Sequence, residues 1–154
     1  MGADAERRRG APRVAVAADA DLLRRLFREY RASLGDAGEH LVGFDEEVAA
    51  LPGGFDLVLV AGDLGCVALR RVHEHACEMK RLYVRPAARG TGAGRELILA
   101  LIEHARAGGY TVMYLDTLPS MVAAGSLYRS LGFVETKRYN DNPAPGVRFM
   151  ELQL

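Results

Sequence analysis

A glycine-rich segment in the second half of the chain has the residue types that phosphate binding requires. Residues 89–94 (RGTGAG) follow a predicted strand and precede a predicted helix. Glycine lets a backbone approach a ligand closely and adopt positive φ angles. The N–H groups in the first turn of a helix lack intrahelical partners, so they can bind an anion. Because Arg85 and Arg89 add guanidinium groups beside the segment, we predict a phosphate-binding loop here.

Two other glycine-rich phosphate motifs do not fit this segment. A P-loop ends in Gly-Lys-Ser/Thr, whereas Gly94 is followed by Arg95 and Glu96. A Rossmann fingerprint has the spacing G-x-G-x-x-G at the start of a parallel α/β unit, with an acidic residue about 20 residues later. Here the spacing is G-x-G-x-G after a predicted antiparallel meander, although Asp116 lies at about that distance. For the glycines considered alone, a plain flexible connection remains the alternative.

The elements that must position the loop are predicted from hydrophobic periodicity and turn residues. The predicted strands are residues 13–17, 55–61, 66–72, 76–84, 111–117, 133–136 and 147–152. Four helices are predicted: one begins at residue 20, one spans residues 45–51, one runs from the glycine segment to Gly108, and one spans residues 121–131. The order βααβββαβαββ indicates an α/β fold of the α+β type. We expect a mixed, mostly antiparallel sheet of about seven strands with helices on both faces.

The composition indicates a single domain without a strong preference for a charged partner. The chain has 154 residues, of which 49% are hydrophobic and 26% are charged. Lys and Arg total 20, as do Asp and Glu, so no net field attracts nucleic acid or an anionic membrane. We expect residues 1–12 to be a flexible tail and residues 13–154 one domain, with neither nucleic acid nor a membrane as partner.

The start of the chain and its cysteines indicate a cytoplasmic protein without a metal site. Residues 1–12 lack the apolar region of a secretory signal, and no run approaches ~20 apolar residues. Cys66 and Cys77 lie in apolar runs without metal-ligand spacing, so we expect small buried residues in a reducing compartment. Residues 73–75 (HEH) have no third ligand at a suitable spacing and are more typical of a polar turn.

Two segments together resemble the GNAT N-acetyltransferase superfamily. Residues 89–94, after the strand residues 82–86 (LYVRP), match the R/Q-x-x-G-x-G/A signature of that family. Residues 126–133 (SLYRSLGF) are similar to its A-L-Y-x-x-x-G-F segment, with Ser126 in place of the usual alanine. The element order agrees from residue 13 onward. The glycine signature alone is moderately specific, whereas the two motifs in order on the right elements are strongly specific.

The resemblance implies that acetyl-CoA is the cosubstrate, while the expectation of no metal rests on the cysteine and histidine spacings above. In the family, the strand before the loop pairs through its main chain with the pantetheine arm, and a bulge commonly separates that strand from its parallel neighbour. The loop amides would then hold the pyrophosphate. The cofactor-binding residues implied in this way are Leu82, Tyr83, Val84, Arg89, Gly90, Thr91, Gly92, Ala93, Gly94 and Arg95.

The resemblance also implies two catalytic residues, Tyr128 and Glu78. Tyr128 matches the family tyrosine near the sulfur and would protonate the departing thiolate; its alternative is a core aromatic. A free ammonium has a pKa near 10, so the attacking amine needs a base, and Glu78 is the candidate. The alternative for Glu78 is a surface ion pair with Lys80 or Arg81. In a flat strand Glu78, Lys80, Leu82 and Val84 would share one face, with the Leu82 amide near the reacting carbonyl.

The expected activity is acetyl transfer to a primary amine, of a small molecule, by direct attack in a ternary complex. The alternatives are a protein N-terminal or lysine acetyltransferase and a non-catalytic acyl-CoA-binding module. Glu39 and His40 are weaker substrate-binding candidates, because the loop between the first two helices often shapes the acceptor pocket in the family. Residues 140–146 are a turn-rich loop that either covers that pocket or only connects two strands. The sequence does not determine whether the chain forms a homodimer.

Overall fold

The computed structural model describes residues 10–154, so residues 1–9, most of the predicted tail, lie outside the described residues. The chain runs through β1 (Pro12–Val14), η1 (Ala17–Asp19), α2 (Ala20–Ser33), η2 (Gly35–His40), α3 (Phe44–Ala50), β2 (Leu57–Ala61), β3 (Gly65–His73) and β4 (Ala76–Val84). It continues through η3 (Pro86–Ala88), α4 (Ala93–Ala107), β5 (Val112–Thr117), α5 (Val122–Ser130), β6 (Val134–Glu135) and β7 (Arg148–Gln153). The predicted order of elements is confirmed, with the strand expected at residues 133–136 reduced to two residues.

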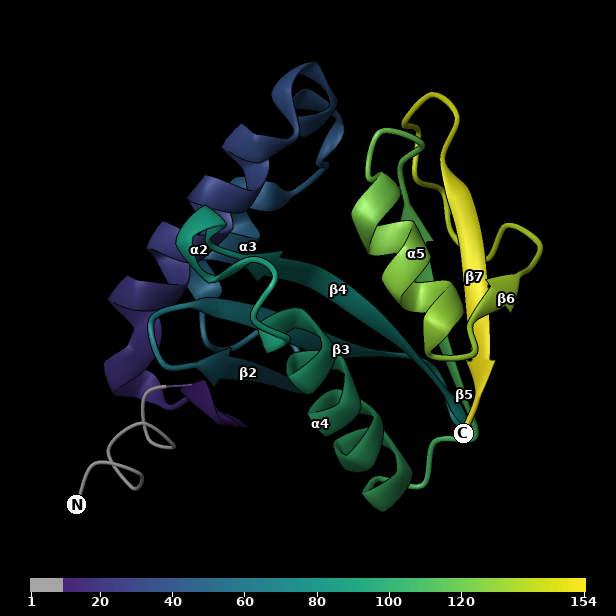
Figure 1. Cartoon of the computed structure of the whole chain (residues 1–154), viewed down its shortest axis with the longest axis horizontal. Helices are drawn as coiled ribbons and strands as arrows, with labels where there is room; N and C mark the ends of the chain where they lie inside the picture. Colours follow the sequence, from purple (N-terminus) through teal and green to yellow (C-terminus); the bar gives the residue numbers. More distant parts are fainter. Residues whose placement is uncertain (1–9) are drawn as a thin grey trace.

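The strands form one seven-stranded sheet in the order β1-β2-β3-β4-β5-β7-β6. The meander β2–β3–β4 is antiparallel, as are the pairs on the other side of β5, and only β4 and β5 pair in parallel. This parallel pair is short, because it joins only residues 76–78 to residues 112–114. Beyond it the two strands diverge in Figure 1, so within residues 10–154 the β5-facing edge of β4 has no strand partner from Met79 onward.

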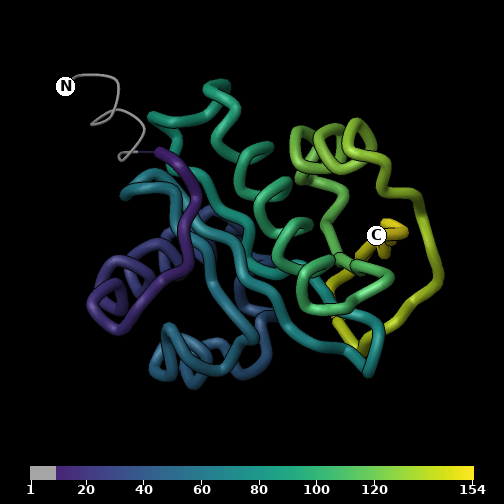
Figure 2. The backbone as a smooth tube through the Cα atoms, turned by 90° about the horizontal axis from the view of Figure 1, so that it is seen from below, coloured from purple at the N-terminus to yellow at the C-terminus, as the bar shows by residue number. Residues whose placement is uncertain are grey.

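Helices cover both faces of the sheet (Figure 2), and a separate hydrophobic core lies on each face. On one face the buried stripe of α4, including Leu97, Ile98 and Leu101, packs with α5 and the inner residues of β3 to β5. On the other face Leu23, Leu26 and Phe27 of α2 pack with α3 and β2 to β4. The predicted mixed sheet with helices on both faces is therefore confirmed. Among the described residues, none of the helices has the length and apolar character needed to span a bilayer.

A bulge in β4 re-aims the side chains that follow it. Lys80 pairs with Ala68 and Tyr83 with Cys66, so β4 has one more residue than β3 between these pairs. The extra residue is Arg81, whose φ of 58° is uncommon for a residue other than glycine. Because the bulge reverses the alternation, Leu82 faces the same core as Met79, while Tyr83 faces the opposite one.

The prediction that Glu78 and Lys80 share a face with Leu82 and Val84 is therefore wrong. It assumed a flat strand, whereas the bulge at Arg81 turns Leu82 and Val84 toward α4 and leaves Glu78 and Lys80 on the α3 side. The result is that one strand presents charged side chains to one face of the sheet and apolar side chains to the other.

Candidate active site

The glycine loop ends as the N-terminus of α4. Gly90 and Gly92 have φ angles of 77° and 87°, and a Cβ at either position would meet nothing within 4 Å. These two glycines are therefore required by the backbone conformation rather than by crowding. The first hydrogen bond of α4 runs from the Glu96 amide to the Gly92 carbonyl, 3.0 Å. The three amides of residues 93–95 precede it and are free to bind an anion, with the helix dipole adding to the attraction.

The loop lies beside α5, which carries the second sequence motif. A Cβ on Gly94 would stand 3.5 Å from Leu127 Cδ2 and 3.6 Å from Val84 Cγ2. The Thr91 hydroxyl donates a hydrogen bond to the Ala88 carbonyl and helps to shape the turn. The glycine segment, the end of β4 and α5 therefore meet, although they are separated in the sequence.

The arginines near the loop differ in their availability for phosphate. Arg85 forms an ion pair with Glu29 at 2.9 Å and donates a hydrogen bond to the Asp63 carbonyl at 2.9 Å, so it ties β4 to α2. Its guanidinium lowers the pKa of Glu29. Arg89 donates to the Val84 carbonyl at 3.2 Å and is exposed, as is Arg95. Neither of these two forms an ion pair within residues 10–154, so they are the cations open to a bound phosphate.

The Tyr83 side chain faces away from the α4 side of the sheet. Its hydroxyl donates a hydrogen bond to Glu29 at 3.3 Å, and its ring packs edge-on against Tyr30 of α2. Of the three predicted β4 contacts, only Leu82 and Val84 direct their side chains toward α4 and α5. A ligand on that side would meet Tyr83 through its main chain alone.

A narrow cavity of about 20 Å³ lies where β4 and β5 diverge. It is lined by side chains of both strands, including Leu82 and Asp116, and by Tyr128 of α5. The bulge and the divergence of the strands therefore bring the predicted tyrosine to the opening in the sheet. The expected notch between β4 and its parallel neighbour is present.

Tyr128 is buried at this opening, with 5% of its surface exposed. Its ring packs against Phe133, with the centroids 5.9 Å apart, and its hydroxyl has no hydrogen-bond partner within residues 10–154. Burial, followed by the nearby Tyr30 and Asp116, raises the pKa of Tyr128. The phenol is therefore protonated at neutral pH.

Glu78 is buried, and the ion pair with Lys80 that its alternative supposed is present at 3.9 Å but is buried rather than at the surface. It is 7% exposed and is the last β4 residue that pairs with β5. The Tyr139 hydroxyl donates a hydrogen bond to its Oε2 at 2.8 Å. Arg70 Nη1 lies 3.9 Å from Glu78 Oε1, and Lys80 Nζ lies 3.9 Å from Glu78 Oε2.

A larger hollow, which we name the α3-side pocket, opens beside Glu78 and has a volume of about 390 Å³. Its lining residues are His40, Leu41, Val42, Glu47, Arg70, Glu78, Lys80, Arg81, Asp116, Asn140, Asp141, Asn142 and Pro143. Lys80, Arg81 and Asp116 also line the narrow cavity at Tyr128, so the two spaces adjoin.

Asp116 stands at that junction and is held by three donors. Lys80 Nζ lies 3.1 Å from its carboxylate, and the side-chain amides of Asn140 and Asn142 donate hydrogen bonds at 2.8 and 3.1 Å. Burial alone would raise the pKa of Asp116, but Lys80 and the two amides outweigh burial and lower it. Asp116 is therefore an anion at neutral pH and fixes the loop after β6 against the pocket.

Sequence reasoning overlooked two of these residues. Asp116 was considered only for a Rossmann motif and rejected, and Tyr139 was not singled out. The alternation of β5, in which Asp116 interrupts an apolar strand, was the available signal. Residues 140–143 do line the pocket, which favours the covering role over a plain connection.

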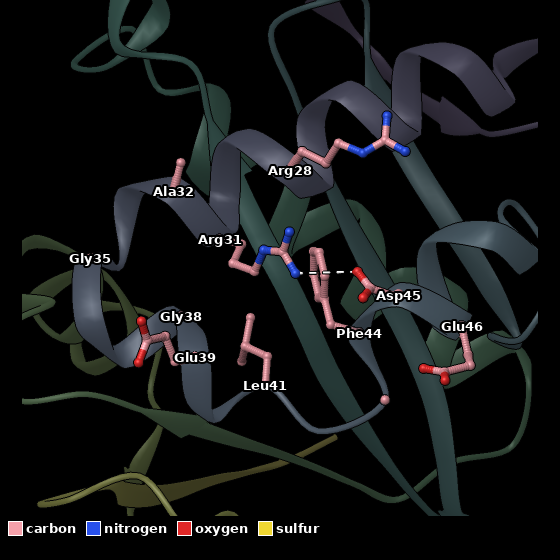
Figure 3. Close-up of a pocket in the computed structure, with 11 residues that line it drawn as sticks. Arg28, Arg31, Ala32, Gly35, Gly38, Glu39, Leu41, Phe44, Asp45 and Glu46 are labelled. Carbon is pink, nitrogen blue, oxygen red and sulfur yellow. Dashed lines mark hydrogen bonds and ion pairs between the residues drawn. The ribbon is translucent and has the colours of Figure 1, made fainter.

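The two weaker candidates in η2 are separated by the fold. His40 lines the α3-side pocket, whereas Glu39 lines another hollow, of about 530 Å³, between α2, η2 and α3 (Figure 3). In that hollow Arg31 pairs with Asp45 at 3.3 Å. None of the predicted catalytic or cofactor-binding residues reaches it.

The cysteines are buried, as expected, and carry no reactive thiolate. Burial raises the pKa of both Cys66 and Cys77 to about 12. Residues 73–75 form the end of β3 and its turn into β4. In the described part of the chain no group of three or more His, Cys, Asp and Glu side chains is placed to hold a metal ion.

Comparison with known proteins shows acetyltransferase relatives. An uncharacterized N-acetyltransferase of Schizosaccharomyces pombe is 44% identical over 107 residues, which cover 64% of this chain and 64% of the relative. The L-methionine sulfoximine/L-methionine sulfone acetyltransferase of Salmonella typhimurium is 38% identical over 81 residues, covering 47% of this chain and 46% of that enzyme. The matched segments span less than two thirds of these relatives' own lengths.

Solved structures agree over nearly the whole chain. Ribosomal-protein-alanine N-acetyltransferase from Brucella melitensis is 28% identical with a TM-score of 0.73, covering 93% of this chain and 99% of that one. A Salmonella typhimurium structure with its cofactor acetyl-CoA has a TM-score of 0.73 at 24% identity, covering 94% of both chains, and shares the fold. The model of the acetyltransferase (GNAT) family matches residues 20–133. The chain therefore belongs to the GNAT acetyltransferase family, as its two sequence motifs predicted.

Proposed function

We propose that this chain transfers the acetyl group of acetyl-CoA to a primary amine of a small molecule, by direct attack in a ternary complex. The observation that carries the proposal is the junction of two spaces at the divergence of β4 and β5. The α4 side presents the free amides and the glycine loop, while the α3-side pocket opens on the other face of the sheet. A donor and an acceptor bound on opposite faces can meet at this opening.

On the donor side, the main chain does most of the binding. The amides of residues 93–95 suit the pyrophosphate, and Gly90 and Gly92 leave open space around it. Exposed Arg89 and Arg95 supply positive charge without a protein carboxylate as competitor. The unpaired edge of β4 offers backbone groups to an extended amide-containing arm. The structure with acetyl-CoA on the same fold supports this choice of cosubstrate.

At the opening, Glu78 and Tyr128 have complementary roles. Glu78 accepts a proton from the ammonium, directly or through water, so that the neutral amine can attack the thioester carbonyl. Tyr128, a phenol that is protonated at neutral pH, donates a proton to the departing thiolate. The second proton that the amine nitrogen releases on becoming an amide restores the phenol. Tyr128 lines the opening itself, and Glu78 lines the α3-side pocket that adjoins it, so each can serve a different partner of the reaction.

A small acceptor is favoured over a protein by the shape of the α3-side pocket. Residues 40–42 border it on one side and residues 140–143 on the other, and its 390 Å³ is at the small end of ligand pockets. The similarity to the Brucella enzyme keeps a protein N-terminus as the second candidate.

The direct test is release of free thiol from acetyl-CoA by the purified chain with a panel of amines. We expect turnover with at least one small amine and loss of that turnover in Tyr128→Phe. Binding of acetyl-CoA without thiol release across the panel, with peptides included, would support a non-catalytic binding module instead.

A further inference from the structure

We infer that the acceptor is a free α-amino acid, with its carboxylate bound by Arg70 and its amine beside Glu78. The inference rests on the proposed function and adds the substrate class. It comes from the arrangement of charges in the α3-side pocket, where cations and carboxylates alternate.

Most of the charges in this pocket already have a partner. Arg81 forms a close ion pair with Glu47, 2.7 Å, and Lys80 forms one with Asp116, 3.1 Å. Arg70 and Glu78 are held more loosely: Arg70 lies 3.3 Å from Glu47 and 3.9 Å from Glu78, and no hydrogen bond joins Arg70 to Glu78. Arg70 and Glu78 are therefore a cation and a carboxylate, side by side in the pocket, that can each form a further ionic contact.

Arg70 is fixed in place but has donors to spare. Its guanidinium lies over the Phe55 ring, 4.5 Å from the centroid, and one nitrogen donates to Glu47 at 3.3 Å. A guanidinium has five N–H donors, so the others can form the parallel pair of hydrogen bonds that a carboxylate accepts. Its side chain is 37% exposed, so a ligand in the pocket can reach it.

The spacing of the two groups selects an α-amino acid. Arg70 and Glu78 are direct partners across β3 and β4, so an ammonium at one and a carboxylate at the other must be close neighbours. In an α-amino acid a single carbon separates these two groups. A peptide N-terminus has a neutral amide where the carboxylate would be, and a simple amine has neither, so both would leave Arg70 without its ligand.

The rest of the pocket can contact the acceptor's side chain. Leu41, Val42 and Pro143 supply apolar surface to this pocket, and none of them lines the narrow cavity at Tyr128. A side chain that extends from the α-carbon toward these residues would leave the amine near Glu78 and Tyr128.

The test compares three acceptors that differ only in the carboxylate. The common L-α-amino acids are screened by thiol release, and the best is compared with its C-terminal amide and its decarboxylated amine. We expect kcat/KM for the free acid to exceed that of both analogues by about 10- to 100-fold, the range for a hydrogen bond to a charged group. Arg70→Gln should raise KM for the acid by a similar factor and leave the analogues within about threefold.

Arg71→Gln is the matched control, because Arg71 is the next residue on β3 and does not line the pocket. It should leave all three acceptors unchanged, and acetyl-CoA affinity should be unchanged in both variants. An amide or amine used as well as the acid would overturn the inference while the proposed function stands. An equal loss for all three acceptors in Arg70→Gln would also overturn it, since Arg70 would then only support the fold. Absence of transfer to any amine would overturn the proposed function itself.

Discussion

The two sides of the opening between β4 and β5 are assembled in different ways. On the α4 side, the binding groups are main-chain amides from one contiguous segment, positioned by two glycines at positive φ. On the α3 side, they are side chains from η2, α3, β3, β4, β5 and the segment after β6. The main-chain arrangement suits a ligand that is the same in every reaction. The side-chain arrangement can be altered by substituting one residue at a time, which would change the ligand that is bound.

This difference has a kinetic consequence. A change on the α4 side should weaken the cosubstrate and therefore lower activity with every acceptor alike. A change on the α3 side should alter selectivity among acceptors and leave acetyl-CoA affinity unchanged. Four further variants, taken in order of decreasing effect, test whether the two sides are separable in this way.

The largest effect is expected for Gly92→Asp. Its φ of 87° strains any residue with a Cβ, and a carboxylate at the start of α4 would repel a pyrophosphate. Acetyl-CoA binding, measured by calorimetry, should fall by at least about 100-fold. Gly92→Asn is the control, because Asn has the same shape as Asp and a similar backbone cost at positive φ but carries no charge. Equal affinities in both variants and the parent would contradict the assignment of the loop.

Tyr128→Phe should lower kcat by about 10²–10⁴-fold with little change in KM for acetyl-CoA, because it removes only the proton donor. The Tyr128 hydroxyl has no hydrogen-bond partner within the described residues, and the ring packing against Phe133 is kept. Thermal unfolding should therefore be almost unchanged. A parent-like kcat would show that the thiolate leaves without help from this residue.

The same contrast explains what the sequence could predict. The glycine loop could be predicted because its function depends on backbone angles and on a helix start, which are local properties of residues 89–94. The sheet followed from the hydrophobic periodicity of its strands. The lining of the α3-side pocket could be predicted only in part, because Asp116 and Tyr139 are brought to Glu78 by the order of strands across the sheet.

One local feature of β4 was implied only by the family resemblance, without a position, and it determines which side chains face the site. No glycine or other turn residue occupies the position of the bulge at Arg81, so the local sequence does not indicate it. Tertiary contacts support it instead: the Arg81 guanidinium donates two hydrogen bonds to Glu47 of α3. Because those contacts join residues 34 positions apart, strand periodicity alone predicted a flat β4 and placed Glu78 on the wrong face relative to Leu82.

Glu78→Gln should lower kcat by about 10²-fold, because the amide that replaces the carboxylate cannot accept the proton of the amine. KM for acetyl-CoA should not change, since Glu78 lies on the α3 side. Tyr139→Phe is the control: it removes the 2.8 Å hydrogen bond but keeps the carboxylate, so kcat should fall far less than in Glu78→Gln. A parent-like kcat in Glu78→Gln would assign the base to another group.

The smallest effect, and one on stability, is expected for Asp116→Asn. The pKa of Asp116 is lowered in the folded chain, so this carboxylate stabilises the fold above its unfolded pKa, and the contribution is lost as pH falls through the folded pKa. At pH 7 the variant should lose about 1–3 kcal/mol in the free energy of unfolding, because Lys80 is left with a weaker partner. The difference between variant and parent, measured by urea unfolding, should shrink below about pH 4. A difference that stays constant with pH would mean that the Asn140 and Asn142 contacts, rather than the charge of Asp116, stabilise this side of the site.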